Sequence, residues 1–177
     1  MQRPTSVTVF GILNIAFACF GVLGILASIA LFNLPASSGN PVVKIMQDNP
    51  TYAAFMKISI LLGIFSSLAM LAAGIGLLML KGWGRYLSIG YAIYAILFGI
   101  VGVVMNFLFL VRPLLERASQ QQGPEAAGAI GGAIGGSFGG CFGLIYPILL
   151  LIFMLRPRVV AAFQQPPYPQ NPGFPPR

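Results

Sequence analysis

The sequence contains very few acidic residues and no histidine. Its 177 residues include three carboxylates, Asp48, Glu116 and Glu125, and charged residues of both signs make up only 7% of the chain. A soluble domain usually carries about 25% charged residues, so this chain has too few to cover a water-exposed surface. Without histidine, no serine or cysteine has the usual base to activate it. We therefore expect a protein that is not an enzyme and that holds no cofactor or metal.

Cysteine is also scarce, and a phosphate-binding loop is missing. Cys19 and Cys141 stand inside apolar segments, where cysteine acts as a small apolar packing residue. The glycine-rich segment lacks the lysine and the hydroxyl residue of a phosphate-binding loop. The net charge is +7, but the basic residues stand singly or in pairs at the ends of apolar runs. That placement is typical of membrane anchors, so we expect a lipid bilayer as partner and no nucleic acid.

Long apolar runs are what the chain does contain, with 57% hydrophobic residues and a mean hydropathy of +0.87. A helix of about 20 apolar residues crosses roughly 30 Å of hydrocarbon, and its backbone satisfies its own hydrogen bonds there. Four runs qualify, at residues 7–31, 58–80, 87–111 and 134–155. The sequence therefore predicts an all-α polytopic membrane protein. Residues 1–160 should form a bundle of four transmembrane helices, and residues 161–177 a disordered Pro-rich tail.

The basic residues near the span ends predict the orientation. One side holds Arg3, Lys81, Arg85, Arg156, Arg158 and Arg177, mostly in short segments. The other side holds Lys44, Lys57, Arg112 and Arg117 together with all three acids. We therefore expect both termini on the cytoplasmic side. The turn between the second and third runs carries four residues typical of headgroup-level anchors, with binding of an anionic lipid as the alternative: Lys81, Trp83, Arg85 and Tyr86.

The two outer segments, residues 33–57 and 112–133, contain helix start signals. Asn-Pro pairs stand at positions 40–41 and 49–50, and each combines a helix-capping residue with proline at the first helical position. The first pair predicts a short amphipathic helix that ends near Gln47, and the second predicts that the second span begins early. Together these segments should form a small helical cap outside the membrane.

Inside the predicted spans, the strongest polar groups are Asn14 and Asn106. Each could hydrogen-bond to a neighbouring helix, and the alternative is that they line a polar path. Two prolines should also shape the spans. Pro113 should kink or end the third span, and Pro147 should bend the fourth.

The segment GAIGGAIGGSFGGCFG, at residues 128–143, repeats every four residues and resembles a glycine zipper. In a helix this spacing places the glycines in two rows: Gly128, Gly132, Gly136 and Gly140, and Gly131, Gly135, Gly139 and Gly143. Eight glycines cost about 6–8 kcal/mol relative to alanine, which close helix contact in lipid can offset. The second span offers a matching small face at Ser59, Gly63 and Ser67, which favours contact within the chain. Contact between subunits and a flexible linker are the alternatives.

Two segments, RPTSVTVFGILN at residues 3–14 and GIGLLMLKGWGRYLSIGYAIYAI at residues 74–96, carry a family resemblance. They resemble a group of uncharacterised four-span bacterial membrane proteins of planctomycetes with a glycine-zipper-like repeat. The similarity covers residues 3 to about 163. It implies a bacterial cytoplasmic (inner) membrane location, and it adds no catalytic site.

We therefore expect a non-catalytic integral membrane protein, a structural or accessory subunit that acts through helix packing. One alternative is a homo-oligomeric channel or small-solute transport component, and another is a lipid-binding protein that uses a groove beside the glycines. The partner could be a second copy or an unidentified membrane protein. In the tail, prolines recur every three residues at Pro166, Pro169, Pro172 and Pro175, so the tail either docks in a proline-binding groove or is disordered.

Overall fold

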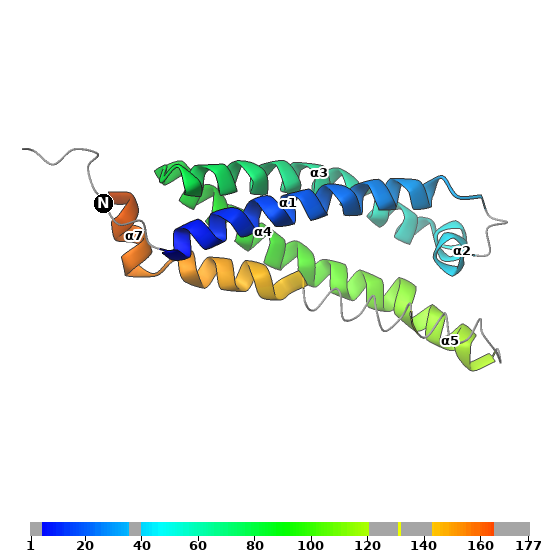
Figure 1. Ribbon diagram of the computed structural model, residues 1–177. Helices are drawn as coiled ribbons and strands as arrows, with labels where there is room; N and C mark the ends of the chain where they lie inside the picture. The colour runs from blue at the N-terminus through cyan, green and yellow to red at the C-terminus, as the bar shows by residue number, and fades with distance from the viewer. Residues whose placement is uncertain (1–4, 36–39, 121–130, 132–142, 165–177) are drawn as a thin grey trace, which may run out of the picture.

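The computed structural model describes residues 5–35, 40–120, 131 and 143–164, and these contain helices and no β-strand. The all-α prediction is confirmed for this part of the chain. Residues 165–177 of the predicted Pro-rich tail and most of the glycine repeat lie outside the described residues. The elements, drawn in Figure 1, are α1 (Thr5–Phe32), α2 (Pro41–Asp48), α3 (Pro50–Leu78), α4 (Gly82–Asn106), the π-helical segment η2 (Phe107–Val111), α5 (Arg112–Gln120), the helix Gly143–Met154 and α7 (Pro157–Gln164).

Three helices are long and apolar enough to cross a membrane: α1, α3 and the continuous 35-residue helix Gly82–Glu116. The helix Gly143–Met154 and the segment Pro157–Phe163 meet at a bend of 67°, and they make a fourth candidate if they form one span. The described residues therefore contain three to four candidate spans. The three continuous helices all extend beyond the predicted ranges at one end or both, because residues outside the apolar runs continue the helix.

The Asn-Pro pairs begin helices as predicted. The Asn40 side chain accepts a hydrogen bond from the backbone N–H of Val42 at 2.9 Å, at the start of α2. The Asn49 side chain accepts one from the N–H of Tyr52 at 3.1 Å, at the start of α3. In both helices the proline occupies the first turn, where its missing N–H would have no partner in any case. This prediction is confirmed.

The helix continues through Pro113, although the sequence indicated a kink or an end there. Proline removes one N–H, and its ring excludes the carbonyl group four residues earlier. The preceding turn is widened into η2, in which the N–H of Arg112 donates to the carbonyl oxygen of Phe107, five residues back. A π-turn of this kind makes room for the ring while the chain stays helical. As Figure 1 shows, α4, η2 and α5 follow one another along a single path.

Close contacts at glycines fix how α1 and α3 lie against each other. A Cβ atom added to Gly74 would lie 2.9 Å from the carbonyl oxygen of Gly11 and 2.8 Å from the Ile15 side chain. Farther along the antiparallel pair, a Cβ atom on Gly21 would lie 2.7 Å from the Ser67 hydroxyl. The absence of side chains at these glycines therefore allows the two backbones to approach.

The turn between α3 and α4 brings Gly76 against Gly84. A Cβ atom on Gly76 would lie 2.6 Å from the Gly84 Cα and 2.9 Å from the Trp83 ring. The turn closes through a hydrogen bond from the N–H of Lys81 to the carbonyl oxygen of Gly76 at 2.9 Å, and Leu80 has a φ of 52°. A leucine in this left-handed region is strained, so the close packing on either side must hold it there.

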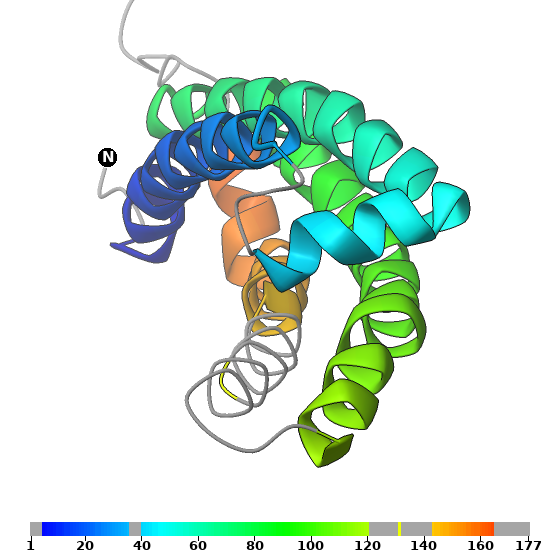
Figure 2. The same ribbon diagram turned by 90° about the vertical axis from the view of Figure 1, so that its right-hand side faces the viewer.

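The helices form a curved layer in which α3 lies between α1 and α4, and the helix Gly143–Met154 lies beside this layer (Figure 2). Two buried clusters hold the layer together. The α7-end core contains Val7, Phe10, Leu77, Ala92, Leu150, Met154 and Val159. The α2-end core contains Val43, Ile45, Met46, Tyr52, Val111 and Leu114. These clusters lie toward opposite ends of the molecule in Figure 1.

One helix, α7, differs from the sequence prediction. The predicted tail begins at residue 161, but α7 continues to Gln164. Val159 is 2% exposed, and Phe163 packs against the α7-end core. This apolar face stabilises the short helix α7. The sequence predicted a tail for its last residues because of the proline-rich segment that follows.

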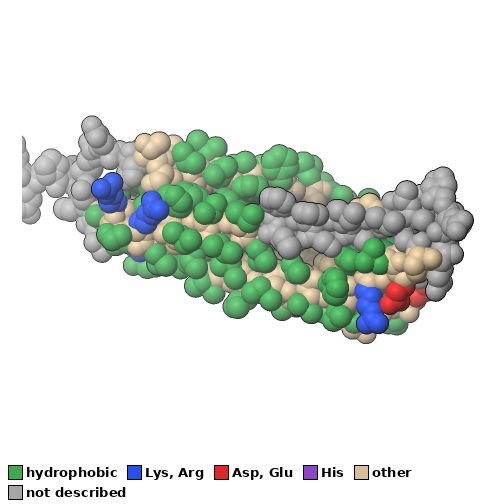
Figure 3. Space-filling view, turned by 90° about the horizontal axis from the view of Figure 1, so that it is seen from below, with side chains coloured by type: hydrophobic (Ala, Val, Ile, Leu, Met, Phe, Trp, Pro, Cys, Tyr) green, Lys and Arg blue, Asp and Glu red, His purple; other side chains and the backbone are tan. Residues whose placement is uncertain are grey.

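The surface changes from charged to apolar and back along the molecule. Figure 3 shows one face, on which hydrophobic side chains cover the middle, Lys and Arg lie at both ends, and acidic side chains lie at one end only. Large apolar side chains stay exposed on the long helices, such as Phe20 at 67%, Leu97 at 62% and Phe65 at 63%. An apolar band between charged ends is the pattern that a bilayer requires.

Candidate functional site

The first candidate site is a polar cluster around Asn14, which is completely buried. The Tyr146 hydroxyl donates to the Asn14 Oδ1. The Asn14 Nδ2 donates to the Ser88 Oγ at 3.5 Å, and this hydroxyl in turn donates to the carbonyl oxygen of Gly84 at 2.8 Å. This chain of bonds, the Asn14 cluster, connects α1, α4 and the helix Gly143–Met154.

Aromatic rings surround the Asn14 cluster. The ring centroids of Phe17 and Tyr146 lie 4.4 Å apart, and those of Phe10 and Phe153 lie 4.9 Å apart. Tilted contacts at these distances are favourable, and they keep water away from the amide. An interhelical hydrogen bond in such surroundings contributes roughly 0.6–2 kcal/mol to helix association. The groups of this cluster are uncharged, so its chemistry suits the fixing of helices rather than proton transfer.

The second candidate site is a polar pair near the α2-end core, the Asn106 pair. The Tyr52 hydroxyl donates to the Asn106 Oδ1 at 2.9 Å, and the Asn106 Nδ2 donates to the carbonyl oxygen of Gly102 at 2.9 Å. Tyr52 is only 1% exposed, and its ring stacks on Phe109 at 6.2 Å. The pair connects α3 with α4. Both asparagines therefore make the interhelical hydrogen bonds that the helix-packing interpretation predicts.

Sequence reasoning missed Tyr52 as the partner of Asn106. The single local signal is its position, because it stands in the first turn of α3 directly after the capping Asn49. An aromatic residue there could equally have faced the lipid headgroups. Only the packing of α3 on α4 shows that its hydroxyl reaches Asn106.

The predicted interface anchors divide into two kinds. Lys81 is exposed, as are Trp83 at 50% and Tyr86 at 70%, which suits residues at headgroup level. Arg85 is half-buried, and its Nε donates to the carbonyl oxygen of Met154 at 3.1 Å. This carbonyl lies at the carboxyl end of a helix, where a positive charge is favourable. Arg85 therefore joins α4 to the helix Gly143–Met154, a role that the sequence did not reveal.

The face of α3 that was expected to receive the glycine repeat has contacts with α1. A Cβ atom on Gly63 would lie 3.4 Å from the Ile25 side chain, and Ser67 lies against Gly21 of α1. Ser59 donates to the carbonyl oxygen of Phe55 in its own helix at 2.8 Å. At Gly63 and Ser67 this face therefore lies against α1. The interpretation that it packs against the glycine repeat stays a prediction, because most of the repeat lies outside the described residues.

The glycine repeat itself is described at two positions only. Among the residues that the structure describes, an added Cβ atom at Gly131 or at Gly143 would meet nothing within 4 Å beyond its own neighbours in the helix. The other six glycines, Gly128, Gly132, Gly135, Gly136, Gly139 and Gly140, lie outside the described residues. Directly after the repeat, the helix Gly143–Met154 contacts α4. A Cβ atom on Gly99 would lie 2.5 Å from the Leu144 side chain.

The described residues offer no further chemical site beside these two polar clusters. Within the ranges 5–35, 40–120, 131 and 143–164, no group of three or more His, Cys, Asp or Glu lies together that could hold a metal ion. In the same ranges, every buried side-chain nitrogen and oxygen has a hydrogen-bond partner. The two polar sites are therefore internally satisfied.

No family model matches the chain, and no significant match was found among the curated proteins or the solved structures. The structure therefore identifies the general class of protein and no particular family. This class is an all-helical protein with three to four helices that are long and apolar enough to cross a membrane.

Proposed function

We propose that the chain is a non-catalytic integral membrane protein that serves as a structural or accessory subunit through helix packing. The observation that carries the proposal is the Asn14 cluster, in which an amide in the middle of an apolar helix is fully buried and bonded to two other helices. A polar group that lines a solute path keeps hydrogen-bonding capacity free for the solute. Here the capacity is used to fix the helices relative to one another.

The proposed architecture is a bundle of four spans with a helical cap on the outer face. The support for the cap is the distribution of side chains on α2, where Val43, Ile45 and Met46 are buried while Lys44 and Asp48 are exposed. Charged groups avoid hydrocarbon, so α2 is best accommodated at the membrane surface or outside it. The α2-end core would then join the cap to the spans.

The proposed location is the cytoplasmic membrane of a bacterium, with both termini inside. The described part of the α7 end carries four basic residues and no acidic residue: Lys81, Arg85, Arg156 and Arg158. The two described acids, Asp48 and Glu116, lie toward the other end. Lys44, Lys57 and Arg112 also lie toward that other end, but the basic residues of the α7 end stand in shorter segments beside the candidate spans. Basic residues in such short segments favour a cytoplasmic α7 end. An alkaline phosphatase fusion should be active at Gly39 and inactive at Gln170, and the reverse pattern would refute the orientation.

Reconstitution into liposomes tests the functional proposal against the channel alternative. Asn14→Leu and Asn106→Leu should lower the stability of the protein, because each removes an interhelical hydrogen bond. The liposomes should be no more permeable to ions and small solutes than empty ones. A solute flux through wild-type liposomes that Asn106→Leu abolishes would instead establish the channel and refute the accessory role.

A further inference from the structure

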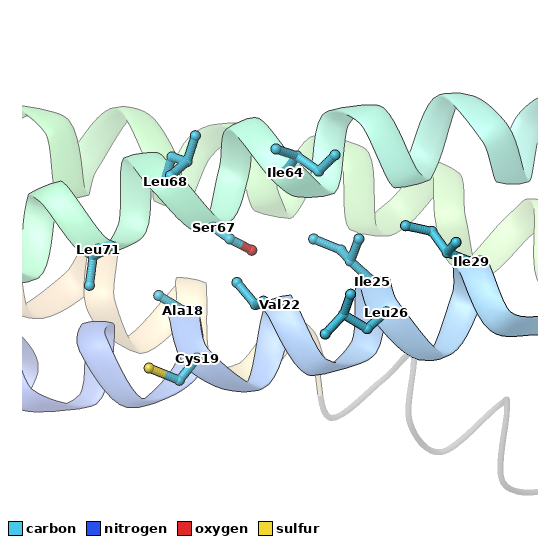
Figure 4. Close-up of a pocket in the computed structure, with 10 residues that line it drawn as sticks. All are labelled: Ala18, Cys19, Val22, Ile25, Leu26, Ile29, Ile64, Ser67, Leu68 and Leu71. Atoms are coloured by element: carbon cyan, nitrogen blue, oxygen red, sulfur yellow. The ribbon is translucent and has the colours of Figure 1, made fainter.

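A groove of approximately 330 Å³ runs along one side of the contact between α1 and α3. Its lining extends from Ala18 to Ile29 on α1 and from Ile64 to Leu71 on α3, and Figure 4 shows these side chains along the two helices. The lining is aliphatic apart from the thiol of Cys19 and the hydroxyl of Ser67. The groove is therefore suited to a hydrocarbon chain and to little else.

The length of the groove corresponds to one leaflet of a bilayer. Ala18 and Ile29 are separated by a rise of about 16 Å along the helix, which is roughly half of the 30 Å hydrocarbon core. Ala18 lies near the middle of α1, and Ile29 lies in its last turn. A groove that begins at mid-membrane and ends at the surface matches a single acyl chain, which also extends from the midplane to a headgroup.

A basic residue stands at the surface end of the groove. Gly21 lies against Ser67, and Gly63 lies against Ile25, so the antiparallel pairing brings Lys57 level with the end of α1, just beyond Ile29. Spacings of seven and four residues place Lys57 on the same helical stripe as the groove residues Ile64 and Leu68.

The charge of Lys57 is available to a ligand. Lys57 is exposed, and it forms no ion pair with a carboxylate in the part of the chain that the structure describes. A lysine at the end of a span extends its ammonium group toward the headgroups while its alkyl chain stays in the apolar region. This position complements a negative charge directly above an acyl chain in the groove.

We propose that the α1–α3 groove binds one anionic phospholipid, with an acyl chain along the aliphatic lining and its headgroup phosphate paired with Lys57. The inference rests on the proposed membrane location and adds a ligand to it. The aliphatic lining supplies retention of the chain, and Lys57 supplies the preference for a lipid with net negative charge over a zwitterionic one.

Native mass spectrometry of the full chain in mild detergent tests the headgroup contact. The probes are dioleoyl phosphatidylglycerol and dioleoyl phosphatidylcholine, which differ in headgroup charge and share their tails. The wild type should retain one phosphatidylglycerol in preference to phosphatidylcholine. Lys57→Gln should weaken phosphatidylglycerol binding about fivefold, the effect of one basic residue near a membrane surface, and leave phosphatidylcholine binding unchanged. Lys81→Gln, at the opposite end of the molecule, should have no effect.

Two substitutions at neighbouring positions of α1, one in the groove and one outside it, test the groove itself. Val22 lines the groove and is 48% exposed, whereas its neighbour Leu23 is 60% exposed and points elsewhere on α1. Val22→Trp should fill the groove and weaken binding of both lipids, while Leu23→Trp should retain it. Unchanged helicity by circular dichroism confirms that each variant is folded.

The inference can be overturned at either of its two contacts, the headgroup contact or the groove, and both outcomes differ from failure of the proposed function. Equal binding of the two lipids, or a lipid preference that survives Lys57→Gln, would refute the headgroup contact. Wild-type binding by Val22→Trp would refute the groove. In both cases the protein still requires detergent for extraction. If an alkaline carbonate wash released it from membranes, the membrane location itself would be refuted.

Discussion

The contact between Gly76 and Gly84 gives the sharpest prediction about stability. A Cβ atom on Gly84 would lie 2.4 Å from the Gly76 carbonyl carbon, 2.6 Å from the Gly76 Cα and 2.7 Å from the Leu77 backbone nitrogen. All three neighbours are backbone atoms, so no side-chain rotation can relieve the contact. Gly84→Ala must therefore move α3 and α4 apart.

The size of this effect follows from the distances. Non-bonded carbon atoms are most favourable at about 3.5–4.0 Å, so the helices must separate by roughly 1 Å. Overpacking of this kind typically costs about 1–3 kcal/mol, and occasionally more. Gly82 is a matched control, because it lies in the same turn of α4 and a Cβ atom there meets nothing within 4 Å. Both variants change the intrinsic helix propensity alike. The difference between the two variants in free energy of unfolding therefore reports the contact between α3 and α4. Gly84→Ala should be less stable than Gly82→Ala by about 1–3 kcal/mol.

Titration with sodium dodecyl sulfate in mixed micelles, followed by far-ultraviolet circular dichroism, measures this difference. Trp83 is the only tryptophan of the chain, and its ring lies beside Gly76, so its fluorescence should also shift when the contact opens. Gly84→Ala should unfold at a lower detergent fraction than Gly82→Ala. Equal midpoints for the two variants would show that α3 and α4 do not approach as closely as described.

Three further predictions use the same titration. Asn14→Ala should lower the free energy of unfolding by about 1–3 kcal/mol, because it removes two interhelical hydrogen bonds of about 0.6–2 kcal/mol each; a loss under about 0.3 kcal/mol would contradict this. Arg85→Ala should cost about 0.3–1 kcal/mol and speed amide hydrogen exchange near Met154, and unchanged exchange would argue against the Arg85 contact. Gly99→Ala should stay within about 1 kcal/mol of the open position Gly102→Ala, because its neighbour is the movable end of a leucine side chain; a larger loss would mean that this side chain cannot move.

Local signals in the sequence predicted the helix boundaries well. The capping asparagines act within three residues, and the following prolines fix one backbone angle each, so α2 and α3 begin where the sequence indicates. The widened turn before Pro113 was not predictable in the same way. Proline indicates that one hydrogen bond is lost, but whether the helix ends or widens depends on the packing of Val111 and Leu114 in the α2-end core.

The pairing of the helices could not be predicted from the same residues. A row of small residues shows that a face permits close approach, but it does not identify the helix that covers it. Gly63 and Ser67 match the glycine repeat in spacing, and in the structure they lie against Ile25 and Gly21 of α1. The spacing alone did not indicate this pairing with α1.

The two asparagines show how much a polar residue in an apolar run can reveal. An unpaired polar side chain in hydrocarbon is energetically unfavourable, so it needs a hydrogen-bond partner. The sequence therefore identifies Asn14 and Asn106 as contact positions, but it does not identify the residues that they contact. In the structure each accepts from a tyrosine hydroxyl of another helix, Tyr146 for the first and Tyr52 for the second. The first bond connects α1 with the helix Gly143–Met154, and the second connects α3 with α4, so each joins a different pair of helices.

The first bond lies near the α7-end core and the second near the α2-end core. The α1–α3 contact between them is of a different kind. There the described contacts involve glycine, serine and aliphatic side chains, among them Gly21, Ser67 and Ile25. Such contacts depend on the close fit of the two backbones rather than on hydrogen bonds. The groove lies in the same stretch. Polar contacts on either side of this stretch would hold the lining in place for a lipid chain, an arrangement that suits a packing role better than a polar path between the helices.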